Sequence, residues 1–174
     1  MPLQPPPAIS DVAFGMLAAG ALVATIIDIR TRRIPNVLTA SMTGLGIAMA
    51  LLGISGISAG AALGGIFVGF LVMMPGYMLG ATGAGDVKLM AAIGAILGPP
   101  LVVTAFLCTA IVGGILALVV AAQRGRVAAT LAGTGRMIAA PAGARQEIQT
   151  ASVKQRFAYG PAIAIGSVIA GLVG

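Results

Sequence analysis

The chain has 174 residues, of which 59% are hydrophobic and only 8% are charged, and its mean hydropathy is +1.08. A soluble domain carries about 25% charged residues, so this chain has too little polar surface to cover a soluble globule. We therefore expect a single membrane-embedded domain over residues 1–174. The net charge of +6 indicates membrane orientation rather than nucleic-acid binding, because the basic residues fall at the ends of apolar stretches.

The composition also restricts the chemistry. The chain has no histidine and one cysteine, Cys108. It therefore lacks the usual general base and zinc ligand, and it cannot form an internal disulfide or a cysteine-based metal site. Acid–base chemistry would have to use the four acidic residues, and we expect no metal and no cofactor.

The apolar stretches predict an all-α, polytopic integral membrane protein with about six transmembrane helices, since each crossing needs about 20 apolar residues. The N-terminal stretch has no basic residue before its apolar segment, so we expect the first helix to be a permanent anchor rather than a cleaved signal peptide. The uncharged stretch 37–79 must be a hairpin, because a single helix of that length would be about twice as long as the hydrocarbon core is thick. The helices are expected at about 8–27, 37–52, 58–79, from Asp86 to before Pro99, 101–122 and 159–173.

The basic residues predict the orientation of these helices. Six alternating helices place all ten on one face, which the positive-inside rule makes cytoplasmic. Six of them lie in the segment 123–157, which we expect to be a basic cytoplasmic segment along the membrane surface. The other four, which we interpret mainly as topology determinants, are Arg30, Arg32, Arg33 and Lys88.

Glycines recur at four-residue spacing in the apolar stretches. Such spacing lets helix backbones approach closely in lipid, so we predict helix packing and no chemical role for these glycines. The pairs are Gly60/Gly64, Gly65/Gly69, Gly76/Gly80 and Gly94/Gly98.

Two acids are expected at the same membrane face, because Asp28 ends the first helix and Asp86 begins the fourth. Asp86 could be an ordinary helix cap, and Asp28 could pair with a neighbouring arginine. The helix dipole disfavours an anion at a C-terminus, so capping does not explain Asp28. Asn36, which follows Pro35, is expected to cap the second helix. Gly83 and Gly85 are expected to allow positive φ angles and the close approach of a peptide beside Asp86.

Three motifs appear along the chain in a recognisable order. Residues 83–88 read GAGDVK, residues 28–36 read DIRTRRIPN, and residues 157–166 read FAYGPAIAIG. The set resembles the GxGD signature, the first aspartate motif and the YGP motif of the type IV prepilin leader peptidases, which are membrane aspartic proteases. The resemblance covers nearly the whole chain.

The resemblance implies an endopeptidase that removes the short basic leader from a pilin precursor at the cytoplasmic face of the inner membrane. It implies that Asp28 and Asp86 are the catalytic pair and activate water. The residues implied to bind substrate or shape the site are Gly83, Gly85, Lys88, Tyr159, Gly160 and Pro161. The implied partners are the pilin precursor and membrane lipid. The pilus assembly machinery is a third candidate partner. Glu147 is a candidate contact for the basic leader.

One departure from the family pattern concerns cysteine. Many members carry paired Cys-x-x-Cys motifs linked to N-methylation of the trimmed pilin, and this chain has none. It therefore resembles the short, peptidase-only form of Flp (tight-adherence) pilus systems. A resemblance to the preflagellin peptidases is a second alternative. Two other readings remain: a small transporter or channel, which would place its acids near mid-membrane, and a non-catalytic assembly scaffold.

Overall fold

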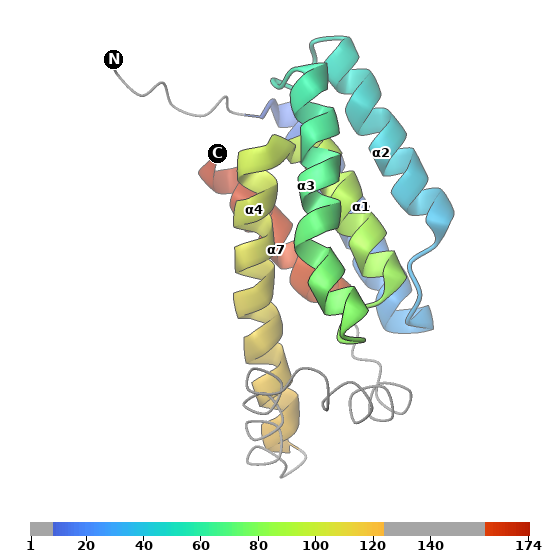
Figure 1. Cartoon of the computed structure of the whole chain (residues 1–174), viewed down its shortest axis with the longest axis vertical. Helices are drawn as coiled ribbons and strands as arrows, with labels where there is room; N and C mark the ends of the chain where they lie inside the picture. The colour runs from blue at the N-terminus through green and yellow to red at the C-terminus, as the bar shows by residue number, and fades with distance from the viewer. Residues whose placement is uncertain (1–8, 124–158) are drawn as a thin grey trace.

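The computed structural model describes residues 9–123 and 159–174, and these residues form helices joined by short loops. The helices are α1 (Asp11–Thr31), α2 (Asn36–Leu51), α3 (Ala59–Met78), α4 (Ala84–Gln123) and α7 (Gly160–Val173) (Figure 1). α1 and α3 are long and apolar enough to cross a membrane, and so by length is the Ala84–Val119 part of α4, which contains the reversal at Gly98. α2 and α7 are shorter apolar helices. The all-α membrane class is therefore confirmed, while the number of six crossings stays a prediction.

Some predictions fall outside the described residues. The basic segment was expected over 123–157, and only Gln123 of it is described. Glu147 and the six basic residues of that segment lie outside, so their predicted positions stay predictions.

α4 is two helices joined at a sharp reversal. Gly98 has φ 75° and ψ 176°, which no α-helical residue adopts, and the two arms run antiparallel on either side of it (Figure 1). Pro99 and Pro100 then occupy the first turn of the second arm, where their missing N–H groups leave no helical hydrogen bond unmade. The predicted break before Pro99 is confirmed, and the two arms correspond to the predicted fourth and fifth helices.

The first arm of α4 is the most buried part of the molecule. Every residue from Leu89 to Gly98 is buried, whereas the other helices bury one face and expose apolar side chains on the other. α4 packs against α2, α3 and α7. This contrast is typical of a helical bundle in lipid, where the outward faces contact acyl chains rather than water.

Glycines make the contact between α3 and the first arm of α4. A Cβ atom on Gly65 would overlap the carbonyl group of Gly94, and one on Gly69 would lie 2.5 Å from the carbonyl oxygen of Met90. The two backbones therefore touch, as the four-residue spacing predicts.

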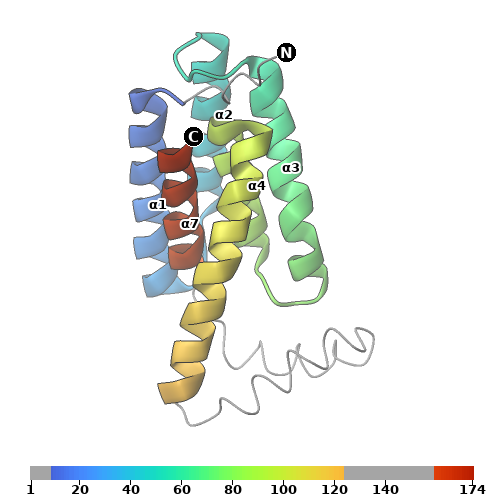
Figure 2. The same cartoon turned by 90° about the vertical axis from the view of Figure 1, so that its left-hand side faces the viewer.

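The described helices alternate in direction. The α1–α2 and α3–α4 connections and the start of α7 lie at one end of the bundle, here called the Asp28 end (Figures 1 and 2). Arg30, Arg32, Arg33 and Lys88 belong to this end. The α2–α3 turn, with Gly53 and Gly56 at positive φ, and the exposed Asp11 lie at the other end. The predicted alternation therefore holds for every helix that is described.

Candidate active site

Asp28 is buried although it is an aspartate in the last turn of α1. Its side chain is 5% exposed, and its Oδ2 atom accepts a hydrogen bond of 2.8 Å from the backbone N–H of Gly160. Arg30, Arg32 and Arg33 are exposed, and within the described residues Asp28 forms no ion pair. Pairing with an arginine therefore does not explain Asp28, and a backbone donor from the last helix holds it instead.

The start of α7 is shaped to meet Asp28. A Cβ atom on Gly160 would lie 2.8 Å from Asp28 Oδ2 and 2.9 Å from Asp28 Cβ, so only glycine allows the backbone this close. Pro161 follows within the first turn of α7, where the fixed φ angle of proline suits a helix start. These two residues place the Gly160 N–H group on the carboxylate.

Asp86 is the third residue of α4 and is 9% exposed. Its Oδ2 atom accepts a hydrogen bond of 2.8 Å from the Gly83 N–H group, while the Gly83 carbonyl oxygen accepts from the N–H groups of Asp86 and Val87. Gly83 has no side chain to complete a capping box, so this is one half of that motif. Asp86 is not the N-cap residue itself, but one of its carboxylate oxygens does accept a backbone N–H group at the start of α4, as the capping interpretation expects. A helix cap can be made by an exposed aspartate, so capping alone does not explain why Asp86 is buried. Aspartate is almost never buried without a specific partner or role.

The two glycines before Asp86 behave differently from each other. Neither Gly83 nor Gly85 has a positive φ, which in this loop occurs at Gly80 (φ 78°), so that expectation was wrong. At Gly85 the close neighbour is the chain itself, since a Cβ atom there would lie 3.2 Å from the Cβ of Ile34, and the expected approach of a substrate peptide stays a prediction. Ile34 is 8% exposed and belongs to the 28–36 motif. Gly85 therefore joins the loops that follow Asp28 and precede Asp86.

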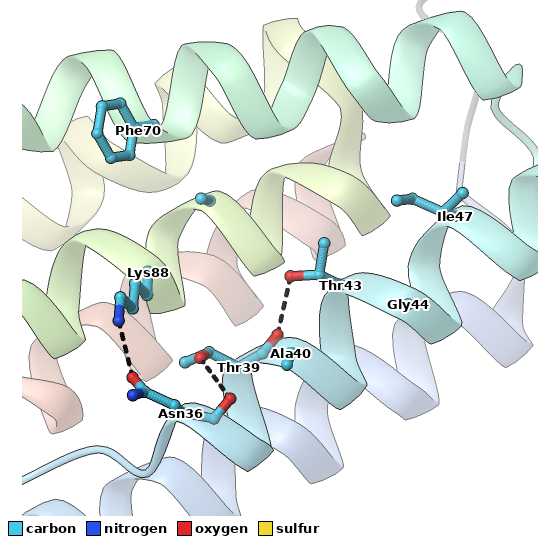
Figure 3. A pocket seen from close by; sticks show the side chains of 9 residues that line it. Asn36, Thr39, Ala40, Thr43, Gly44, Ile47, Phe70 and Lys88 are labelled. Atoms are coloured by element: carbon cyan, nitrogen blue, oxygen red, sulfur yellow. Dashed lines mark hydrogen bonds between the residues drawn. The ribbon is translucent and has the colours of Figure 1, made fainter.

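Lys88 and Asn36 form a second link between the two motifs. The Lys88 Nζ atom donates a hydrogen bond of 2.9 Å to Asn36 Oδ1 (Figure 3). The prediction that Asn36 caps α2 was wrong: Pro35 occupies the cap position without a side-chain bond, and Asn36 is the first helical residue. The amide oxygen of Asn36 accepts a hydrogen bond from Lys88, 52 residues away. Local sequence rules cannot detect a bond over that separation.

Tyr159 directly precedes α7. Burial raises the pKa of its phenol above the ordinary value of 10.0, and the nearby Asp86 carboxylate raises that pKa further. The phenol therefore keeps its proton at physiological pH, close to Asp86, while the next residue, Gly160, binds Asp28. The dipeptide Tyr159–Gly160 thus places one residue on Asp28 and the other near Asp86.

One contributor to this site was missed by the sequence reasoning. Gly113, on the second arm of α4, faces Tyr159, and a Cβ atom there would lie 2.9 Å from the phenol oxygen. The only sequence signal was the Gly113–Gly114 pair in an apolar helix, which by itself indicates nothing more than close packing.

The arrangement is suited to acid–base chemistry. In residues 9–123 and 159–174 no group of three His, Cys, Asp or Glu side chains could hold a metal ion. Two buried carboxyl groups at one end of a bundle, with a protonated phenol beside one of them, can take and give protons.

Comparison with known proteins identifies the family. A family model described as the type IV leader peptidase family matches residues 15–118, a stretch that includes Asp28, Asp86 and Lys88. No curated protein and no solved structure gives a significant match. Because the match covers more than half of the sequence, the chain belongs to the type IV leader peptidase family, a family of proteases that act on pilin precursors.

Proposed function

We propose that this chain is an aspartic endopeptidase that removes the short basic leader from Flp-type pilin precursors at the cytoplasmic face of the inner membrane. The observation that carries the proposal is the contrast among the three acids that the structure describes. Asp28 and Asp86 are buried at the same end, with Gly160 bonded to Asp28 and Tyr159 near Asp86, whereas Asp11 is exposed at the other end. Burying a carboxylate costs free energy, so two such residues at one place favour a function there.

The proposed reaction uses the two carboxyl groups as a pair. When two carboxyls share a site, one is ionised and the other protonated. The ionised carboxylate takes a proton from water as the water oxygen attacks the scissile carbonyl carbon, and the protonated carboxyl gives its proton to the carbonyl oxygen. The roles then reverse, the C–N bond breaks, and the leaving amine receives a proton.

The surrounding residues orient this pair. The N–H groups of Gly160 and Gly83 each bind one oxygen of an aspartate and so fix the planes of the two carboxyl groups. Gly85, Lys88 and Pro161 hold together the segments that carry them. Such positioning matters because a displacement of about 1 Å can cost on the order of a hundredfold in rate.

Two further observations support a peptidase-only enzyme over the alternatives. The acids lie at one end of the bundle, whereas a transporter would use acids near its middle. The sequence has a single cysteine and therefore no Cys-x-x-Cys pair for the methylation function, so we propose peptidase activity alone.

Co-expression with an Flp-type pilin precursor tests the proposal. We expect the wild type to convert the precursor to its mature form, as measured by the mass of the pilin. Asp28→Asn and Asp86→Asn should leave only precursor. Asp11→Asn is the matched control, because it changes an exposed aspartate at the opposite end and should process normally. Normal processing by either active-site variant would contradict the catalytic pair.

Thiol labelling in intact spheroplasts tests the proposed orientation. In a Cys108→Ser background, we expect Leu52→Cys, which is exposed in the α2–α3 turn, to react with an impermeant maleimide added outside. Ala81→Cys, in the α3–α4 loop beside Asp86, should react only after the membrane is permeabilised. The reverse pattern would place the site on the other face.

A further inference from the structure

We infer that an open groove between α2, α3 and the first arm of α4 is the docking site for the apolar helix of the substrate. This inference rests on the proposed function and on the hydrophobic helix that the resemblance to the leader peptidases implies directly after the cut. The groove has a volume of about 620 Å³. Residues of α2 form its floor, and Phe70 of α3 and Lys88 of α4 lie across from them (Figure 3).

The position of the groove fits this occupant. One end is formed by Lys88, two residues after Asp86, and by Asn36, the last residue of the Asp28 motif. From there it follows α2 to Ile47, a helical distance of about 16 Å or three turns. A substrate cut beside Asp86 and continuing into the membrane as a helix would therefore enter the groove at its polar end.

The walls allow another helix to approach closely. Ala40, Gly44 and Ala91 line the groove, and small side chains of this kind let helix backbones pack in lipid. A Cβ atom on Gly44 would meet nothing within 4 Å, so the space in front of it is open. Phe70 is 41% exposed and offers an apolar wall opposite.

The polarity of the groove changes along its length. Lys88 is the only charged residue among the described residues that line it. Further along, the hydroxyl groups of Thr39 and Thr43 donate to carbonyl oxygens of their own helix, at 3.1 and 2.8 Å, so these polar groups need no external partner (Figure 3). A helix with a polar first turn at the membrane surface and apolar turns below it matches this pattern.

Charge also fixes which part of the precursor enters. Lys88 makes the polar end of the groove positive. A basic leader is repelled there, whereas the uncharged helix that follows the cut is not. The leader would therefore extend away from the groove while the apolar helix lies in it.

Filling the groove tests the inference. We expect Gly44→Trp to lower kcat/KM for the full-length precursor in lipid vesicles by about tenfold or more, chiefly through KM, since a tenfold loss of affinity needs only about 1.4 kcal/mol. Gly15→Trp on α1 is the matched control: Gly15 is also an exposed helical glycine with nothing within 4 Å, and it lies outside the groove. Its kcat/KM should stay within about twofold of the wild type.

A crosslink keeps the test decisive if Gly44→Trp fails to fold. In an Asp86→Asn, Cys108→Ser background, which retains uncut substrate, Gly44→Cys should form a disulfide with a cysteine in the apolar helix of the precursor, and Gly15→Cys should not. If Gly44→Cys forms no crosslink, the docking inference is wrong whatever Gly44→Trp does. A wild type that cleaves no precursor would instead overturn the proposed function.

Discussion

Asp28 and Asp86 lie at the same end of the bundle but are held in different ways. Asp28 Oδ2 binds the N–H group of Gly160, 132 residues along the chain, whereas Asp86 Oδ2 binds that of Gly83, only three residues away. The orientation of Asp86 therefore has a support within its own loop. That of Asp28 depends on how α7 packs against α1, so the site is complete only when the two ends of the fold meet.

The largest effect is expected from Gly160→Ala. The added methyl group would lie 2.8 Å from Asp28 Oδ2, so either the carboxylate or the start of α7 must move. We expect kcat/KM for precursor cleavage in vesicles to fall by about a hundredfold. Gly15→Ala, whose methyl group meets nothing within 4 Å, is the control and should cleave normally. Normal cleavage by Gly160→Ala would remove the basis for the long-range support of Asp28.

Gly83→Ala sharpens the comparison, because it makes the same change beside the other carboxylate. Its methyl group would lie 3.3 Å from Asp86 Oδ2, in an exposed loop that can shift by a few tenths of an ångström. We expect a fall in kcat/KM of about tenfold or less, measured in the same assay. A loss as large as that of Gly160→Ala would show that the two acids are held with equal stringency.

Ile34→Ala tests the contact that joins the two regions. Ile34 is 8% exposed and packs on Gly85, so removing its side chain should cost about 2–4 kcal/mol of stability. Thermal unfolding in detergent should show a lower Tm. Ile111→Ala, at a residue that is 64% exposed on α4, should leave the Tm nearly unchanged. Equal Tm values for the two variants would mean that Ile34 does not join the loops.

The smallest effect is expected at the Lys88–Asn36 bond, which is exposed. Lys88→Met, Asn36→Ala and the double variant form a double-mutant cycle for thermal stability. We expect a coupling free energy of about 0.5–1 kcal/mol between the two residues. The value is small because the exposed Lys88–Asn36 hydrogen bond only replaces hydrogen bonds that both groups would otherwise make with water. A coupling of zero would indicate that the two motifs are joined by Ile34 and Gly85 alone.

Much of this fold follows from local features of the sequence. The break at Gly98 is predictable because glycine followed by two prolines cannot continue a helix, and the shared face of Asp28 and Asp86 follows from counting apolar stretches. The features that were missed or wrong depend on contacts between distant segments. Asn36 looks like a cap until Lys88 is placed beside it, and Gly113 has no visible role until Tyr159 is packed against it. The N–H group that holds Asp28 belongs to a helix 132 residues away, so no local pattern reports that bond.

The central claim is that Asp28 and Asp86 act as one catalytic unit. The most direct measurement is single-turnover cleavage of a purified pilin precursor by the wild type, Asp28→Asn, Asp86→Asn and the double variant in lipid vesicles. Because residues that act together are not additive, each single variant should lose as much activity as the double variant. A single variant that keeps a substantial fraction of the wild-type rate, with a further loss in the double variant, would contradict the claim.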